Sequence, residues 1–498
     1  MGRANDRRNN AVLSPTFWSV TGVIVHALIV MIALLVIPTN RKPSSATAWL
    51  LLIAIAPYIG IIIFLLIGSP ELPPRRRRDQ RQMGRLIEQA IARAASDPAA
   101  LSLLQPALPP FAQPHAALAH RLGGMPAFAG NRVELLDDYT AILERMAQDI
   151  DQARYFVHVE YYIVARDSAT AHVFAALERA VQRGVKVRLL FDQIGSRKFP
   201  GRKAMEHHLT AIGVDWRPML PVGKPGEWLR FDLRNHRKLL VVDGAVAYTG
   251  SLNVIDRSYH RKDGLFYDEL CARVSGPVVA QLAAVFATDW HAETGEWLDA
   301  THHPELYQQE WQATGSSLCQ VLPSGSGFED ENNLRLFTAL IHAAQRRLVL
   351  VTPYFVPDDA LVLAMTSAAL RGVQVTLINS AAMDQMLVAY AQRSYYEQLL
   401  QAGVEVLQYR QPILLHTKAI AVDDQIALIG SSNLDLRSFT LNMEVSLVMY
   451  DPAVVAELHR IFAGYISRSN RVELAAWRQR PLTQRLLENI ARLTAALQ

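Results

Sequence analysis

One pattern of eighteen residues occurs twice in the chain, and it constrains the fold more than any other feature. "HRKLLVVDGAVAYTGSLN" (236–253) and "HTKAIAVDDQIALIGSSN" (416–433) share His-x-Lys, an aspartate five residues after the lysine, and Gly-Ser-x-Asn. The two histidines lie 416 − 236 = 180 residues apart, so each copy has room for a domain-sized repeat. The chain of 498 residues is therefore expected to contain a duplicated unit.

The duplication extends upstream of the two patterns. "RGVKVRLLFD" (183–192) matches "RGVQVTLINS" (371–380), and each copy alternates apolar strands with helical segments. This alternation predicts the α/β class, with βαβ units around a mostly parallel sheet. We expect two repeated lobes that face each other, one over 131–310 and the other over 311–498.

The shared residue types suit chemistry on a phosphoryl group. His236 and His416 can act as a nucleophile or as a general acid near neutral pH. A lysine two residues later points to the same face of the strand and supplies a positive charge for a phosphate. The Gly-Ser-x-Asn turn adds neutral donors, and its glycine permits a close approach of the backbone. If the lobes face each other, one histidine lies on either side of a phosphorus atom, and the candidates that hold its oxygens are Lys238, Lys418, Asn253, Asn433, Ser251 and Ser431.

A histidine nucleophile also needs a carboxylate to orient its second ring nitrogen. Asp268 follows His236 by 268 − 236 = 32 residues, and Glu444 follows His416 by 444 − 416 = 28 residues. Each of these acids opens or precedes an apolar strand. We interpret Asp268 and Glu444 as the orienting carboxylates, with surface carboxylates at strand ends as the alternative.

Two apolar segments precede the repeats. Residues 17–37 and 47–67 carry no formal charge, and each is near the roughly 20 residues that a helix needs to cross a bilayer. They predict an N-terminal two-helix transmembrane hairpin over residues 1–70, with buried core helices as the alternative. Arginines before the first segment and after the second outnumber Arg41 and Lys42 between them, which favours cytoplasmic lobes.

The segments that flank the lobes are less regular. "PPRRRRDQRQMGR" predicts a basic juxtamembrane segment that binds anionic lipid, and 71–130 is otherwise interpreted as a linker. At the other end, a helical period predicts one apolar face. We expect this helix to pack on the second lobe, with a position on the membrane as the alternative; its apolar face comprises Leu486, Ile490, Leu493 and Leu497.

The paired motifs resemble those of the phospholipase D superfamily. The rest of the chain is similar to the bacterial cardiolipin synthases, in the two apolar segments and in "EYYI", "LRNHRK", "TPYFVPDD" and "SSNLDLRSFTLNMEV". The resemblance implies a multi-pass enzyme of the bacterial inner membrane that needs no metal or cofactor. It also implies transfer of a phosphatidyl group from one phosphatidylglycerol to another through a phosphatidyl-histidine, which gives cardiolipin and glycerol.

The resemblance also implies roles for single residues. His236 is the expected nucleophile, and His416 is the acid that protonates the leaving glycerol and then deprotonates the incoming alcohol. Asp243 and Asp423 complete the catalytic motifs and are expected to be more structural than chemical. Glu160 is similar to a family position near the mouth of the pocket.

Other reactions use the same centre. Water as the acceptor would give a phospholipase D, other donor or acceptor lipids are compatible, and nucleases of the superfamily act on DNA. The small net charge of +4 and the lack of a basic patch with interleaved aromatic residues in the lobes argue against a nucleic-acid partner. The sequence also has no His-Glu-x-x-His and no clustered carboxylates at metal-ligand spacing, so no metal is expected.

Overall fold

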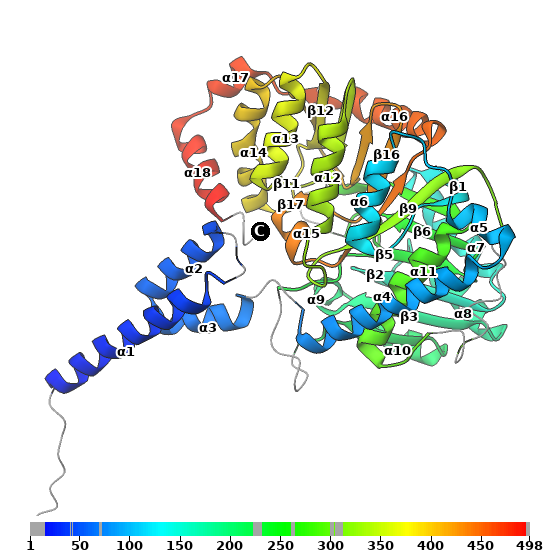
Figure 1. Cartoon of the computed structure of the whole chain (residues 1–498), viewed down its shortest axis with the longest axis horizontal. Helices are drawn as coiled ribbons and strands as arrows, with labels where there is room; N and C mark the ends of the chain where they lie inside the picture. The colour runs from blue at the N-terminus through cyan, green and yellow to red at the C-terminus, as the bar shows by residue number, and fades with distance from the viewer. Residues whose placement is uncertain are drawn as a thin grey trace, which may run out of the picture. The chain divides into compact units, whose positions relative to one another are not determined.

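The structure is a computed structural model, and it describes residues 15–39, 41, 43–68, 72–222, 232–259, 264–298, 303 and 312–494 (Figure 1). The chain divides into two compact units. One is N-terminal and ends near residue 70, and the other contains nearly all the remainder. Each unit is described by itself below.

The described residues of the N-terminal unit form three helices where two were expected. Its helices are α1 (Pro15–Val36), α2 (Pro43–Ile55) and α3 (Pro57–Ile67). The predicted first segment, 17–37, lies in α1, but the second, 47–67, is divided at Ala56, which has φ −136° and ψ 74°. Pro57 explains the break, because a proline disfavours helical geometry in the residue before it and has no N–H to donate. Taken over the residues that the structure describes, none of the helices has both the length and the apolar character needed to span a bilayer.

Residues of α2 and α3 pack closely within this unit. The rings of Trp49 and Phe64 meet edge to face at 5.3 Å, and a Cβ on Gly60 would lie 2.9 Å from the backbone of Ile53. The glycine therefore allows the two short helices to approach each other. Many apolar side chains on the outside of the unit remain exposed; they include Val23, Leu35, Ile55, Ile59 and Leu65.

Much of the segment 71–130, which was interpreted as a linker, is helical. The first of its helices is held by an ion pair to a later part of the same unit. Arg76 donates two hydrogen bonds to the carboxylate of Glu293, at 2.8 and 3.1 Å, and both side chains are buried. The helices are α4 (Pro74–Ala94), α5 (Pro98–Leu104) and α6 (Gln113–Gly123).

The first half of the duplicated unit follows. Strands alternate with helices at first, and the strand that carries the first motif is then followed by a hairpin. Its elements are β1 (Phe128–Leu136), α7 (Tyr139–Asp151), β2 (Phe156–Tyr161), α8 (Ala171–Gln182), β3 (Lys186–Asp192), α9 (Gln193–Arg197), α10 (Arg202–Ala211), β4 (Asp215–Met219), β5 (Lys238–Val242), β6 (Val246–Gly250), β7 (Phe266–Asp268), β8 (Cys271–Ser275) and α11 (Val278–Thr294).

The second half repeats this order and adds elements at its end. It comprises β9 (Ser317–Ser324), α12 (Asn332–Ala343), β10 (Arg347–Val351), β11 (Phe355–Val356), α13 (Asp359–Leu370), β12 (Gln374–Ser380), α14 (Met386–Gln401), β13 (Glu405–Tyr409), β14 (Ile413–Leu415), β15 (Ala419–Val422), β16 (Ile426–Gly430), β17 (Leu434–Asp435), α15 (Leu436–Thr440), β18 (Glu444–Met449) and α16 (Pro452–Ser467). The additions are β19 (Ser469–Arg471), α17 (Leu474–Arg478) and α18 (Leu482–Leu493).

Strands of the two halves form one continuous sheet. Its order is β19-β13-β12-β10-β15-β16-β18-β9-β1-β8-β6-β5-β2-β3-β4, so the halves mirror each other about the β9–β1 pair. This pair is antiparallel, with Phe128 opposite Cys319. The expected lobes are therefore joined edge to edge.

The expectation of a mostly parallel sheet is wrong. Only β2, β3 and β4 in one half, and β10, β12 and β13 in the other, are parallel neighbours in it. The motif strands β5 and β15 run antiparallel to β2 and β10, and each continues through a short turn into β6 or β16. A short turn reverses the direction of the chain, whereas parallel neighbours need a crossover.

Both faces of the sheet are covered, because successive side chains of β5 point to opposite faces and all of them are buried. Leu239 and Val241 pack in a core with α11 and α16, whereas Leu240 and Val242 pack with α7 and α8 on the other face. In the second half, α12, α13 and α14 lie side by side over one face (Figure 1). The first strand of each motif is thus buried throughout, which holds its polar leading residues in fixed positions.

The C-terminal helix packs on the second half, as predicted. α18 lies along α14, and its buried residues are Glu488 and Ala491. The described members of the predicted apolar face, Leu486, Ile490 and Leu493, are exposed. Leu497 lies outside the described residues.

Candidate active site

The two motif histidines lie where parallel strands of the sheet end. Lys238, the first residue of β5, is opposite Tyr161, the last residue of β2, and Ala419 of β15 is likewise opposite Val351 at the end of β10. His236 and His416 precede these strand positions, so both lie at carboxyl ends of parallel strands. Open α/β sheets bind ligands at this edge.

Each histidine is held by a glutamate of the opposite half. The Nδ1 atom of His236 lies 2.9 and 3.0 Å from the carboxylate oxygens of Glu444, and Nδ1 of His416 lies 2.9 and 3.0 Å from those of Glu269. All four side chains are buried. The two His–Glu pairs therefore cross between the halves and place both histidines in one site.

Backbone hydrogen bonds accompany the crossed pairs. The N–H of His236 donates to the carbonyl of Met443 at 2.9 Å, and the N–H of His416 donates to the carbonyl of Asp268 at 2.8 Å. The segment before His416, β14, also pairs in parallel with β7, which ends just before Glu269. Each histidine is thus fixed at both its main chain and its ring by the residues around the opposite glutamate.

The site contains Glu444, as expected, but Asp268 does not contact a histidine ring. Its carboxylate accepts hydrogen bonds from Arg257 at 3.0 Å and from Tyr409 at 2.7 Å. The next residue, Glu269, takes the expected position. Side chains alternate between faces along an extended chain, so the side chain of a neighbouring residue points to the opposite face. Comparison of the two copies could have found it, because Glu269 and Glu444 are both glutamates immediately before an apolar strand.

The two serines of the Gly-Ser-x-Asn turns hold the glutamates. The hydroxyl of Ser251 donates to Glu269 at 2.5 Å, and the hydroxyl of Ser431 donates to Glu444. Their prediction as phosphate ligands therefore has to be corrected, because each hydroxyl proton is already engaged by a carboxylate. The preceding Gly250 permits this contact, since a Cβ there would lie 2.3 Å from the carbonyl oxygen of Leu270.

The two motif lysines are buried beside the histidines. Nζ of Lys238 donates to the carbonyl of His236 at 2.6 Å, and Nζ of Lys418 donates to the carbonyl of His416 at 2.5 Å. Burial lowers the pKa of Lys238 to about 8 and that of Lys418 to about 7, against the opposing effect of the two glutamates. An anionic group in the site would restore the full charge of both lysines, so the site favours such a ligand.

Burial also controls the histidines. It lowers the pKa of His236 to about 4, although the Glu444 carboxylate opposes the shift and the charges of Lys238 and Lys418 reinforce it. The pKa of His416 is lowered by burial too, against Glu269. Because each carboxylate faces Nδ1, a neutral ring carries its proton there, and the lone pair on Nε2 is free.

The motif asparagines are buried near this edge of the sheet. Oδ1 of Asn253 accepts the backbone N–H of Ile163 at 3.3 Å, and the Asn253 side chain also hydrogen-bonds Tyr259. In the described part of the chain, Oδ1 of Asn433 has no hydrogen-bond partner. Their role as phosphate ligands stays a prediction.

Asp243 and Asp423 lie at the far ends of the motif strands. Asp243 accepts the backbone N–H groups of Arg154, Tyr155 and Phe156 at 2.7–2.8 Å. Asp423 accepts three N–H groups in the same way, at 2.8–3.1 Å. Five residues of extended strand span roughly 16 Å, so neither aspartate can reach a group bound at the motif lysine. Although they were counted with the catalytic motifs, both aspartates have the structural role expected of them, as anchors for the chain that enters β2 or β10.

Glu160 is not at a pocket mouth, which corrects that expectation. The side chain is fully buried in β2, where Oε1 accepts Nδ2 of Asn235 at 3.1 Å. Burial and the nearby Asp289 raise its pKa, whereas Arg237 opposes the shift. Glu160 thus belongs to a buried network beneath the motif strand.

Among the described residues, no group of three or more His, Cys, Asp or Glu side chains is arranged to hold a metal ion. The groups that surround the histidines are instead two lysines and two glutamates that are engaged by histidine and serine.

A mirrored α/β sheet that brings two His-Lys pairs together through crossed glutamates defines a phospholipase D-like enzyme. The family model described as "Cardiolipin synthase, PLD-like domain" matches residues 146–290 and 337–466, and the model "Phospholipase_D-nuclease N-terminal" matches residues 27–69. The chain therefore belongs to the cardiolipin synthase family of PLD-like proteins.

Individual relatives agree with this family. Cardiolipin synthase A of Proteus mirabilis (strain HI4320) is 34% identical over 456 residues, which cover 91% of this chain and 92% of that protein. Cardiolipin synthase A of Yersinia pseudotuberculosis serotype O:1b (strain IP 31758) is 35% identical over 479 residues, which cover 93% and 95%. Phosphatidylserine synthase of Haemophilus influenzae Rd KW20 has a similar crystal structure, with a TM-score of 0.57 and 16% identity over 76% of this chain and 98% of that chain, which shows the fold alone.

Proposed function

We propose that the protein is a phosphatidyltransferase that makes cardiolipin and glycerol from two molecules of phosphatidylglycerol. The observation that carries this proposal is the pair of crossed His–Glu contacts at 2.9 Å, each beside a buried lysine. One histidine can form a covalent bond to phosphorus while the other moves a proton. The names of the relatives supply the lipid substrate class.

In the first step, the Nε2 lone pair of His236 attacks the phosphorus of one phosphatidylglycerol. The bond between phosphorus and the headgroup glycerol breaks, and His416, which enters this step as an imidazolium, donates its Nε2 proton to the leaving oxygen. Lys238 and Lys418, with the amides of Asn253 and Asn433, neutralise the charge on the other phosphoryl oxygens. The low pKa of His236, about 4, favours a neutral ring with a free lone pair at neutral pH.

In the second step, a second phosphatidylglycerol enters with its terminal hydroxyl toward the phosphorus. His416, now neutral, takes the hydroxyl proton while the oxygen attacks. The bond between phosphorus and His236 breaks, and its electrons return to the imidazole. Two phosphatidylglycerols are thereby converted to one cardiolipin and one glycerol, and both histidines regain their starting protonation.

Within this proposal, residues 131–310 and 311–498 are the two lobes, and the N-terminal unit attaches them to the bacterial inner membrane. The exposed apolar side chains of α1, α2 and α3 support an insertion of this unit into lipid. We propose that the segments 17–37 and 47–67 make it multi-pass, with the lobes on the cytoplasmic side. If alkaline carbonate releases the full chain from cell membranes, the attachment proposal fails while the reaction proposal stands.

The reaction is tested with the full chain in vesicles that contain phosphatidylglycerol labelled in its phosphate and headgroup glycerol, in the presence of a chelator. The expected products are cardiolipin and free glycerol in equal amounts. His236→Ala in the same vesicles is the control. Phosphatidic acid as the sole product would refute the transferase and leave a phospholipase D in its place.

A further inference from the structure

The helix α18 is amphipathic, but its apolar side points away from the protein. Its exposed residues include Leu482, Leu486, Ile490 and Leu493, which lie on one side of a helix with 3.6 residues per turn. The side chain of Leu493 is 85% exposed and that of Leu486 is 61% exposed. A surface helix of a soluble protein normally turns its apolar stripe toward the core, so this orientation requires an explanation.

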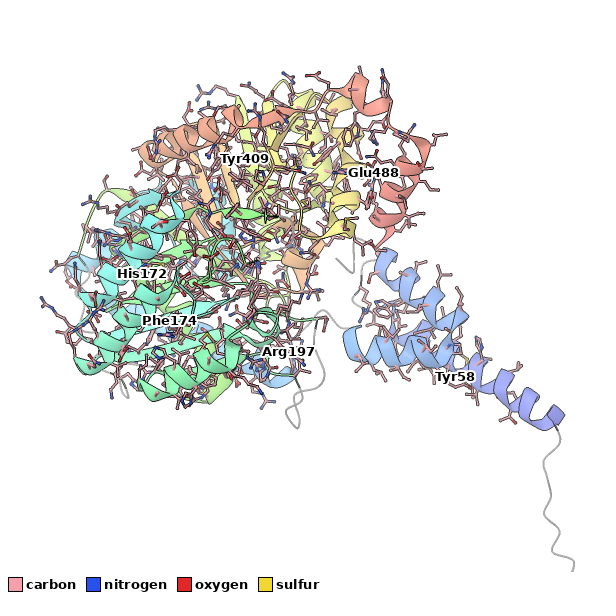
Figure 2. The ribbon with its side chains drawn as sticks, turned by 180° about the vertical axis from the view of Figure 1, so that it is seen from behind. Tyr58, His172, Phe174, Arg197, Tyr409 and Glu488 are labelled. Atoms are coloured by element: carbon pink, nitrogen blue, oxygen red, sulfur yellow. The ribbon has the colours of Figure 1, made fainter. Side chains whose placement is uncertain are left out.

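Polar contacts of the opposite side fix the helix in this orientation. Glu488, labelled in Figure 2, is fully buried. It accepts hydrogen bonds from Nε and Nη2 of Arg480, at 3.2 and 3.0 Å, and from Gln484 at 3.1 Å. Near the end of α18, the guanidinium of Arg492 lies 4.3 Å from the ring centre of Tyr395 on α14. A rotation of α18 that buried the leucines would separate Glu488 from Arg480 and Arg492 from Tyr395, so both contacts favour the observed orientation.

The apolar surface continues from α18 onto α14. Leu487 and Tyr390 line the same shallow hollow between the two helices. Met386 and Leu387, one turn before Tyr390, are both exposed. The combined surface thus contains side chains from two helices of the large unit.

Positive charge flanks this surface. Arg485 borders the apolar side of α18, and Arg393 lines the hollow. Arg492 lies on the side toward α14 and is 3.9 Å from the exposed Asp359. The one acid of α18, Glu488, is buried and paired with Arg480. An apolar face bordered by arginines and without an exposed acid on the same helix complements the headgroup and acyl regions of an anionic bilayer. A second copy would instead place like-charged borders near each other.

We propose that the outer face of α18, together with the first turn of α14, docks on the surface of an anionic lipid bilayer. The apolar side chains enter the boundary between headgroups and acyl chains, and the arginines remain among the headgroup phosphates. This contact is separate from the N-terminal unit and does not require the proposed reaction. If the protein does act on membrane lipids, a second contact would restrict how its large unit is oriented on the bilayer.

The test places a fluorophore on the full chain reconstituted in vesicles. Cys271 and Cys319 are the two cysteines of the sequence and both are buried, so Leu486→Cys provides the accessible thiol for an environment-sensitive dye. Leu370→Cys is the matched control, because Leu370 is 77% exposed at the end of α13. Asp359, at the other end of α13, is 3.9 Å from Arg492, and the eleven-residue separation places Leu370 roughly 16 Å farther along.

The vesicles contain either phosphatidylcholine alone or phosphatidylcholine mixed with an anionic phospholipid, each with a nitroxide-bearing lipid as quencher. The dye at position 486 should emit at shorter wavelength and be quenched several-fold more than the dye at 370, with the larger effect in anionic vesicles. Equal quenching at the two positions would overturn the proposal. Equal effects in the two kinds of vesicle would overturn the anionic assignment.

Self-association is distinguished in the same experiment. A shift at position 486 that grows with the protein-to-lipid ratio but is insensitive to the nitroxide would identify a second copy as the occupant and refute lipid docking. Because no readout depends on turnover, failure of the docking proposal and failure of the cardiolipin synthase proposal are separate results.

Discussion

The two halves hold their histidines in the same way but support the motif strands with different chemistry. In the first half, the residue after His236 is Arg237, which pairs with the buried Asp289 beside Glu160. In the second half, the residue after His416 is Thr417, whose hydroxyl lies 3.1 Å from that of Tyr465. An ionic network and a neutral contact thus support equivalent positions.

A second pair of positions shows the same difference. The backbone N–H of Asn235 donates to the Asp192 carboxylate at 2.9 Å, whereas that of Leu415 donates to the Ser380 hydroxyl at 2.7 Å. Asp192 in addition accepts Arg234 at 2.9 Å. The backbone geometry is preserved while charge has been replaced by neutral groups. The site therefore depends on the crossed glutamates, and the layer beneath is replaceable if each polar group keeps a partner.

Replacement of the histidines should have the largest effect. His236→Ala and His416→Ala are each expected to lower turnover by about 10⁴-fold, because neither histidine can do the work of the other. They should differ in the covalent intermediate, measured as lipid phosphorus that stays with the denatured protein. His236→Ala should carry none, and His416→Ala should carry label that turns over slowly. The reverse pattern would exchange the two roles.

Replacement of the glutamates tests the crossing between halves. Glu444→Gln and Glu269→Gln should each lower turnover by about 10³-fold, because an amide does not hold the ring in the required tautomer. Glu444→Gln should resemble His236→Ala in the labelling assay, and Glu269→Gln should resemble His416→Ala. If each variant instead resembled the histidine variant of its own half, the crossed assignment would be wrong. Asp268→Asn is the control, since its carboxylate bonds to Arg257 and Tyr409.

The supporting layers should differ in their contribution to stability. Arg237→Met leaves Asp289 and Glu160 buried without their cation, and should lower the free energy of unfolding by about 3 kcal/mol or more. Thr417→Val removes one neutral hydrogen bond and should cost only about 1 kcal/mol. Denaturant unfolding of the full chain in detergent, followed by tryptophan fluorescence, measures both. Equal losses would show that the charge difference between the halves has no energetic consequence.

The far ends of the motif strands should behave alike in both halves. Asp243→Asn and Asp423→Asn each weaken three hydrogen bonds from backbone N–H groups, and should lower the free energy of unfolding by about 2 kcal/mol. Turnover per folded molecule should change little, because these carboxylates lie at the ends of β5 and β15 remote from the histidines. The same unfolding assay and a turnover assay at saturating substrate measure the two quantities. A loss of turnover without a loss of stability would return the aspartates to the chemistry.

Local patterns predicted much of this molecule. The repeated motif indicated the duplicated α/β fold. It also indicated four residues of the site, because residue type and two-residue spacing can be read directly from the sequence; these are His236, Lys238, His416 and Lys418. Glu444 was found by the same reasoning. The pairing of each glutamate with a histidine of the other half could not be predicted from local patterns, because it depends on how the two copies meet in space. Asp268 was predicted in place of Glu269, because the sequence does not show which of two neighbouring residues at a strand end faces the site.

Other differences have equally local causes. Ser251 and Ser431 were read as phosphate donors because a hydroxyl is a generic donor, and only the fold shows the carboxylate beside it. The helices α4, α5 and α6 were missed because the segment is rich in alanine and proline and shows little apolar periodicity. For α18, the helical period and the packing on the second lobe were predicted, but not the outward direction of the apolar face. An apolar stripe specifies which residues share a face and not what that face meets.

The crossed pairs make each half depend on the other. One half alone holds a histidine without its carboxylate and a carboxylate without its histidine, so it cannot assemble either pair. Two identical copies related by a twofold axis would assemble both. A chain of half the present length would therefore need to form a homodimer, whereas here the same contact is intramolecular. Within one chain, equivalent positions can carry different residues, as the arginine at 237 and the threonine at 417 do.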